Sequence, residues 1–154
     1  MQPDEEPIRR RDASPKRRFR FDASKRIKKE RDFASVYQFR ARTYNDRMTV
    51  CCRPTGHDAP ARLGLSVSRK VGKAHVRARW KRLIREAFRL QYYDLPQGFD
   101  YVVIPKPQEK VPKYATIAED VKYLTRRAAK KAARFAENAA KEARQKLEPS
   151  SEDE

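Results

Sequence analysis

Residues 62–90 read RLGLSVSRKVGKAHVRARWKRLIREAFRL, and this stretch decides the fold of the chain. Its opening residues alternate Leu and Val with small side chains, which predicts a half-buried strand over 62–68 with one small-residue face. Apolar residues at helical spacing then predict a long helix over 76–92. Gly72 lies between them and permits the tight turn that joins the strand to the helix. The stretch therefore predicts a strand, a short loop and an amphipathic helix.

The predicted helix has two different sides when its residues are placed at about 100° per residue. Trp80, Leu83 and Ile84 fall on an apolar side that faces a core. The other side is cationic, and residues 66–89 hold nine basic groups against one acid, Glu86. Like charges one turn apart repel by roughly 0.2–0.5 kcal/mol per pair, so this arrangement favours an anionic partner over plain solvation. The basic groups are Arg69, Lys70, Lys73, Arg77, Arg79, Lys81, Arg82, Arg85 and Arg89.

The charge of the whole chain points to the same kind of partner. The 154 residues include 38 Lys or Arg against 21 Asp or Glu, which gives a formal net charge of +17. Of this excess, +14 lies in residues 23–113, where the apolar residues are also concentrated. We therefore expect a folded domain whose own surface binds a polyanion, rather than a neutral domain with a basic tail.

Composition divides the chain into four predicted segments. The proline-broken first segment lacks apolar periodicity, and the last seven residues have a net charge of −4. An Ala/Lys/Arg-rich helix precedes that acidic end, and its mixed signs favour a solvated extension over a contact with the polyanion. The predicted segments are a disordered basic tail over 1–22, a folded binding domain over 23–129, a helical extension over 130–147 and an acidic tail over 148–154.

The remaining elements complete an α+β two-layer sandwich in the order α-β-β-α-β-α. A helix is predicted over 28–40, and a strand over 47–53 that pairs antiparallel with the strand over 62–68. Residues 99–104 are continuously apolar apart from Asp100 and predict a strand buried on both faces.

A last helix is predicted over 116–147. Thr116 and Glu119 form a capping-box pattern, which predicts that this helix begins at Thr116. Its apolar spacing thins beyond Ala129, so we expect the remainder to project from the domain.

Several classes of protein are disfavoured by what the chain lacks. Cys51 and Cys52 are adjacent and stand alone, so they predict neither a disulfide framework nor a zinc site. The chain has no apolar run of about 18 residues and no secretory signal, which predicts a cytoplasmic protein without a membrane partner. Clustered carboxylates and a His pair are missing from the basic region, so no catalytic residue is assigned. The glycine spacing does not match a nucleotide-binding P-loop, and no organic cofactor is expected.

The motifs around the basic helix resemble a known family. The helix begins R-A-R-W-K-R at residues 77–82, after the strand and glycine turn of residues 63–72. A first helix with R-I-K-K at 26–29, and the strand D-Y-V-V-I at 100–104, follow the same pattern. In order over residues 24–128, these motifs resemble the protein subunit of bacterial ribonuclease P.

This resemblance implies an RNA-protein enzyme that removes the 5′ leader from precursor tRNA. The RNA subunit would be the catalyst, with magnesium bound mainly by that RNA and the substrate. The protein would bind the catalytic RNA and the leader and broaden the range of substrates, with no obligate protein partner. The implied fold contains a left-handed β-α-β crossover. From the residues alone, the alternative is a structural, ribosomal-type RNA-binding protein without a role in cleavage.

The resemblance also implies a cleft for the leader. Phe33 and Tyr37 are one helical turn apart, which is typical of core residues, although exposed aromatics beside cations stack on bases. The resemblance implies a mixed role, partly packed and partly open to the cleft. Ser66 and Ser68 lie on the small-residue face of their strand, where they either face solvent or leave room for an RNA strand.

Two positions depart from the family pattern. The central Asn of its basic signature is Ala78 here, and the Asn usual after the glycine is Lys73. Both changes remove an amide that is able to hydrogen-bond RNA or a hydrated metal ion. A metal site on the protein is therefore left unassigned, whereas phosphate binding by the basic residues is unaffected.

Overall fold

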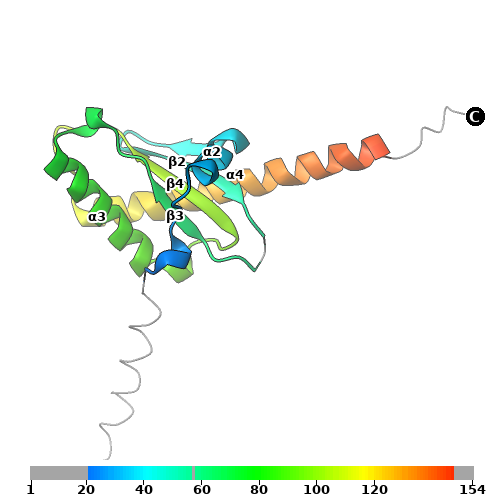
Figure 1. Cartoon of the computed structure of the whole chain (residues 1–154), viewed down its shortest axis with the longest axis horizontal. Helices are drawn as coiled ribbons and strands as arrows, with labels where there is room; N and C mark the ends of the chain where they lie inside the picture. Colours follow the sequence, from blue (N-terminus) through cyan, green and yellow to red (C-terminus); the bar gives the residue numbers. More distant parts are fainter. Residues whose placement is uncertain (1–20, 57, 148–154) are drawn as a thin grey trace, which may run out of the picture.

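The computed structural model describes residues 21–56 and 58–147 (Figure 1). Three α-helices, three short 3-10 helices and four strands follow one another within these residues. The predicted tails over 1–22 and 148–154 lie outside the described residues, apart from Phe21 and Asp22. The elements are η1 (Ala23–Lys25), α2 (Glu30–Phe39), β1 (Ala41–Tyr44), β2 (Met48–Pro54), β3 (Arg62–Leu65), η2 (Arg69–Val71), α3 (Ala74–Leu90), η3 (Tyr92–Asp94), β4 (Phe99–Pro105) and α4 (Tyr114–Leu147).

The four strands form one mixed sheet in the order β1-β2-β4-β3. β2 pairs antiparallel with both β1 and β4, and β3 pairs parallel with β4. The predicted antiparallel pairing of the second and third strands is therefore wrong, because β4 lies between them. β1 was not predicted, so the observed order has one more strand before α3 than the expected one. The parallel pair and α3 form the expected β-α-β unit.

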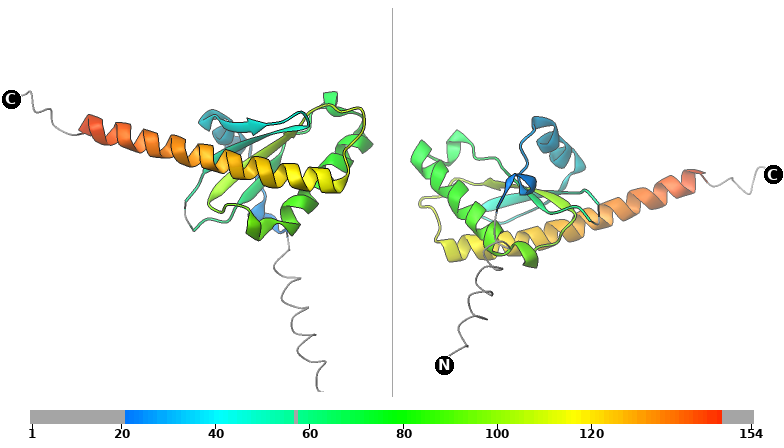
Figure 2. Two further views of the ribbon diagram at one scale, coloured as in Figure 1. Left: turned by 180° about the vertical axis from the view of Figure 1, so that it is seen from behind. Right: turned by 60° about the horizontal axis from the view of Figure 1, so that its bottom comes forward.

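The main core lies between the sheet and the two long helices, α3 and α4. Met48, Tyr101, Trp80, Phe88 and Leu124 are all at most 1% exposed there. We call this side of the sheet the α3–α4 face, and Figure 2 shows α4 running across it. Apolar side chains of alternating strand positions meet apolar helix faces, which accounts for the α+β architecture. The predicted fold class is confirmed.

A smaller core lies on the opposite side of the sheet, which we call the α2 face. Here Val36 of α2 packs with Ile27, Cys51 and Val102. Val102 and its neighbour Val103 are both fully buried although they point to opposite faces. The prediction that this strand is buried on both sides is therefore confirmed.

The last helix differs from its prediction in where it begins and in how far along it contacts the domain. α4 begins at Tyr114, and the amide N–H of Ile117 already donates to the carbonyl of Lys113, so the predicted capping box at Thr116 is wrong. Contact with the domain continues past Ala129, since Ala132 is fully buried and the Phe135 ring lies 6.3 Å from that of Phe39. The turns after Phe135 extend beyond the sheet (Figures 1 and 2).

Candidate nucleic-acid interface

The apolar side of α3 fixes the direction of its cationic side. Trp80, Ile84, Ala87 and Phe88 are buried against the sheet and α4, as their spacing predicts. Only Leu90, the last residue of the helix, is exposed despite its place on the predicted apolar side. Because the helix is anchored along this side, the basic residues between the buried ones face away from the core.

The nine predicted RNA-binding residues all lie on the surface of η2, α3 and the turn between them. Arg69, Lys70, Lys73, Arg79, Arg82 and Arg85 are exposed, and Arg77, Lys81 and Arg89 are half-buried. Arg89 forms an ion pair with Glu86, the one acid of the segment. Among the described residues, no carboxylate forms an ion pair with the other eight. We call these nine side chains the α3 cationic face.

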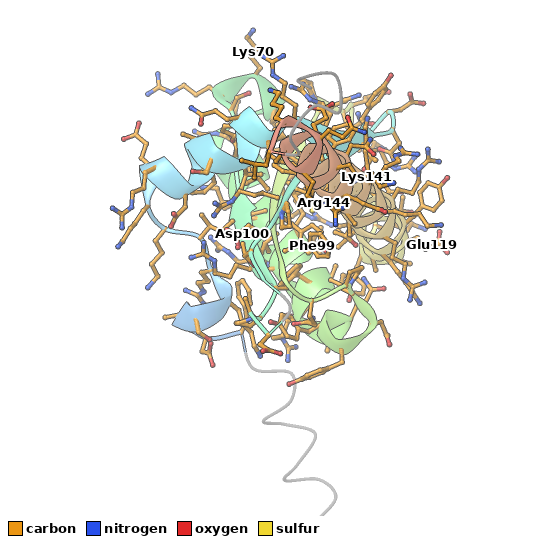
Figure 3. All side chains as sticks on the ribbon, turned by 90° about the vertical axis from the view of Figure 1, so that its right-hand side faces the viewer. Lys70, Phe99, Asp100, Glu119, Lys141 and Arg144 are labelled. Carbon is orange, nitrogen blue, oxygen red and sulfur yellow. The ribbon has the colours of Figure 1, made fainter. Side chains whose placement is uncertain are left out.

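The turn before α3 is shaped by Gly72. Its φ is +153°, and a Cβ at this position would lie 2.8 Å from Cγ1 of Val76. A side chain at this position would therefore strain the backbone and collide with Val76 in the first turn of α3. Arg77 Nε donates to the Gly72 carbonyl at 3.1 Å, which ties the first turn of the helix to the loop. Lys70 projects outward from this loop at the edge of the molecule (Figure 3).

The predicted leader-cleft aromatics lie on α2. A Cβ on Gly64 of β3 would lie 2.8 Å from Cε1 of Phe33, so the Phe33 ring rests directly on the strand backbone. Phe33 is half-buried against the small core of the α2 face, whereas Tyr37, one turn later, is 37% exposed. The structure therefore gives Phe33 a packing role and leaves Tyr37 accessible.

A row of side chains crosses the open part of the α2 face. Tyr44 is opposite Thr49 in the β1–β2 pairing, and Thr49 is opposite Ile104 in the β2–β4 pairing. The amide of Ser66 donates to the Val103 carbonyl at 3.1 Å, which places Ser66 beside Ile104 and completes the row. Ser68 follows two residues later and is exposed. We call Tyr44, Thr49, Ile104 and Ser66 the cross-strand row.

Sequence reasoning identified only the serine of this row. Thr49 and Ile104 are half-buried and Tyr44 is 69% exposed, so they offer a floor of mixed apolar and hydroxyl character. Their proximity depends on strand pairing, which joins Thr49 to Ile104, 55 residues apart in the chain. The pairing register was the signal needed to find them, and local sequence pattern does not contain it.

Two arginines balance the charge of the one buried carboxylate of the sheet. Asp100 is fully buried and accepts hydrogen bonds from Arg62 at 2.7 and 2.8 Å and from Arg53 at 3.0 Å. The hydrogen bonds to Asp100 raise the pKa of Arg62 above its ordinary value. Figure 3 shows Asp100 within the body of the molecule. This carboxylate is therefore a structural anchor of the α2 face and not a free acid or base.

The cysteines do not form a reactive or metal-binding site. Burial raises the pKa of the Cys51 and Cys52 thiols, which keeps both protonated and unreactive. In the part of the chain that the structure describes, no group of three or more His, Cys, Asp or Glu side chains is placed to hold a metal ion. None of the helices within residues 21–56 and 58–147 has the length and apolarity needed to cross a bilayer.

The fold thus combines a mixed four-stranded sheet with two surface features. One is a helix whose cations all lie on one side, and the other is a sheet face with accessible tyrosines at its edges. Together these features define an RNA-binding α+β protein. The family model for ribonuclease P matches residues 21–129. The ribonuclease P protein component of Clostridium kluyveri is 39% identical over 105 residues, covering 67% of this chain and 93% of that protein. That of Desulfovibrio desulfuricans is 37% identical over 117 residues, covering 74% and 90%.

Solved structures agree with these sequence matches. The ribonuclease P protein from Thermotoga maritima superposes with a TM-score of 0.60 at 36% identity, covering 66% of this chain and 96% of that one. The Staphylococcus aureus protein gives a TM-score of 0.59 at 30% identity. The chain therefore belongs to the ribonuclease P protein family, as its motifs predict. Membership makes it an RNA-binding part of a tRNA-processing endoribonuclease, with an RNA subunit as its partner, and disfavours the ribosomal-type alternative.

Proposed function

We propose that this chain binds the 5′ leader of precursor tRNA between α2 and the cross-strand row, while the α3 cationic face binds the catalytic RNA. The observation that carries the proposal is an accessible Tyr37 on α2, the helix that packs on this sheet face, together with a floor of small, hydroxyl and apolar side chains. Such a surface accepts unpaired nucleotides without reading a fixed sequence. In this role the protein supports removal of the leader and broadens the range of precursors cleaved.

The connectivity of the chain supports the proposal that the two surfaces act together. Ser66 ends the cross-strand row, and Ser68 and η2 lead from it directly into α3. A single strand leaving the cross-strand row at Ser66 would therefore meet Arg69, Lys70 and Lys73. Phosphates are the groups that these side chains bind, so the arrangement supports simultaneous contact with leader and catalytic RNA.

The chemistry of cleavage is assigned to the RNA subunit with magnesium. The described residues lack a carboxylate cluster that would hold a divalent ion, and Ala78, on the outward side of α3, offers no ligand atom on its side chain. Hard oxygen ligands such as RNA phosphates suit magnesium. The protein's own contribution is to hold the substrate and to neutralise phosphate charge. A cytoplasmic location remains a prediction.

Replacing Phe33 and Tyr37 together with alanine tests leader binding. Stacking on an aromatic side chain contributes about 1–3 kcal/mol per base, and Tyr37 is the accessible ring of the two. The reconstituted enzyme should therefore bind precursor tRNA roughly 5- to 150-fold more weakly. Its affinity for mature tRNA, which lacks the leader, should stay unchanged. Fluorescence titration of both RNAs measures the two dissociation constants at one salt concentration.

Two further variants make this test specific. Tyr37→Ala alone removes the accessible ring without disturbing the packed Phe33, so a folding defect cannot account for its effect. Tyr93→Ala removes a tyrosine that is 52% exposed on η3, outside the cleft, and should leave both affinities unchanged. An equal loss of affinity for precursor and mature tRNA in the Tyr37 variant would show that the cleft does not hold the leader.

A further inference from the structure

A second basic hollow lies where α4 passes the β1 edge of the sheet. It has a volume of about 860 Å³ and is lined by five cations together with Tyr44, Tyr123 and two other residues. The cations are Arg42, Arg127, Lys130, Lys131 and Arg134. We call this hollow the β1–α4 pocket. β1 and β3 are the two edge strands, so the pocket and the end of β3 that leads into α3 lie at opposite edges of the sheet.

Specific bonds hold the two walls of the pocket together. The Thr43 hydroxyl on β1 donates to the Leu124 carbonyl on α4 at 2.9 Å. About two turns further along α4, Lys131 Nζ donates to the Arg42 carbonyl at 3.1 Å. The pocket is therefore a consequence of the fold and not a chance gap between side chains.

The pocket lining has no carboxylate to balance its charge. Arg127, Lys130, Lys131 and Arg134 repeat at three- and four-residue spacing, where like charges repel. Two acids of α4 are already paired, Asp120 with Arg47 at 2.5 and 2.9 Å and Glu137 with Lys141 at 3.6 Å. Glu119 lies near Arg127 and Lys130, at the edge of the molecule in Figure 3, but within the described residues it forms no ion pair with them. An anionic ligand would relieve this repulsion, as at the α3 cationic face.

Two tyrosines indicate which kind of polyanion fits. Tyr44 is 69% exposed and Tyr123 is 57% exposed, and each ring has a cation beside it, Lys106 at 4.7 Å and Arg127 at 5.3 Å. Exposed rings among cations are the stacking platforms that bind unpaired bases. In double-stranded RNA the bases are stacked inside the helix, so the pocket favours a single strand.

Tyr44 belongs to both surfaces and connects them. It ends the cross-strand row on the α2 face, and it also lines the β1–α4 pocket. A strand that crosses the sheet from Ser66 travels over three strand spacings, about 14 Å in all, before it reaches Tyr44. Beyond Tyr44, the next cations that it meets are Arg42 and the four cations of α4.

We propose that the β1–α4 pocket binds the upstream part of the leader, beyond the nucleotides held on the cross-strand row. This inference rests on the proposed leader binding. Its cations hold the phosphates, and Tyr44 and Tyr123 stack on unpaired bases. The pocket thereby extends the contact of the protein with long leaders, whichever sequence they have.

A series of precursor tRNAs with leaders of increasing length tests this inference in the reconstituted enzyme. Wild-type affinity should rise in a step once the leader is long enough to reach the pocket. The double variant Lys130→Ala, Arg134→Ala should lose that step. For a long leader, its slope of log K against log salt should be shallower by about 1.4, since each single-strand phosphate contact contributes about 0.7. Mature tRNA and precursors with short leaders should bind as before.

A matched variant controls for charge on the same helix. Arg144→Ala, Lys146→Ala removes two exposed cations from the last turns of α4, outside the pocket, and should leave the step intact. An intact step in the pocket variant would overturn the inference. So would an equal loss for mature tRNA, which would assign the pocket to the tRNA body or the catalytic RNA. Neither result bears on the proposed function, which is tested separately by the affinities of the Tyr37→Ala variant for precursor and mature tRNA.

Discussion

α3 and the last turns of α4 are both basic helical segments, yet the structure gives them opposite surroundings. α3 is anchored by Trp80, which is 1% exposed, and it points a row of cations in one direction. Within the described residues, Arg89 alone of these cations pairs with a carboxylate, that of Glu86. The last turns of α4, by contrast, are exposed all round, and Lys141 forms an ion pair with Glu137 at 3.6 Å. The difference teaches that sidedness and lack of ion pairs, and not the number of basic residues, indicate an RNA-binding surface.

The largest expected effect is on the anchor of α3. Trp80→Ala removes a fully buried ring and should lower the free energy of unfolding by about 3–5 kcal/mol. Leu147→Ala makes a similar apolar truncation at a position that is 83% exposed, and should change it by less than about 0.5 kcal/mol. Urea denaturation followed by circular dichroism measures both. A Trp80 variant as stable as the wild type would show that α3 is not held by its apolar side.

A smaller effect is expected on RNA affinity. Arg79→Ala and Arg85→Ala should each remove one phosphate contact, so the double variant should lower the slope of log K against log salt for the catalytic RNA by about 1.8. Filter binding across a salt series gives this slope. The last-turn variant Arg144→Ala, Lys146→Ala loses the same charge and should retain the wild-type slope. Equal slopes in the two variants would remove the distinction between the helices.

Local pattern was sufficient for the elements whose burial is one-sided or complete. Trp80 and Ile84 at helical spacing predicted the apolar side of α3, and the apolar run ending at Ile104 predicted β4. In each case the sequence period itself records which residues contact the core. The family motifs were found within these same segments, which is why the function followed from them.

The missed features depend on contacts between distant parts of the chain. β1 spans only Ala41–Tyr44 and shows little apolar alternation, because it is an edge strand whose Thr43 bonds to α4. The sequence of β2 or of β4 alone does not determine that these two strands pair, in place of β2 with β3. The cross-strand row and the β1–α4 pocket arise from these pairings, so neither was predictable from local pattern.

The helical extension over 130–147 has two parts, of which the first contacts the domain and the second is exposed. The family match ends at residue 129, yet Lys130, Lys131 and Arg134 lie beyond it and line the β1–α4 pocket. Residues 137–147 of α4 are exposed, and their role as a solvated extension stays a prediction. The first turns beyond the family match, in contrast, add these cations to the β1–α4 pocket, whose other lining residues lie within the matched segment.

The stimulation of 5′ cleavage tests the central claim most directly. Precursor tRNA is incubated at low magnesium with the cognate catalytic RNA, alone or with wild-type protein or the two double variants. We predict stimulation by the wild type and by Arg144→Ala, Lys146→Ala, and its loss in Arg79→Ala, Arg85→Ala. No stimulation by the wild type, or an equal loss in both variants, would contradict the account, as would cleavage by the protein after the RNA is removed.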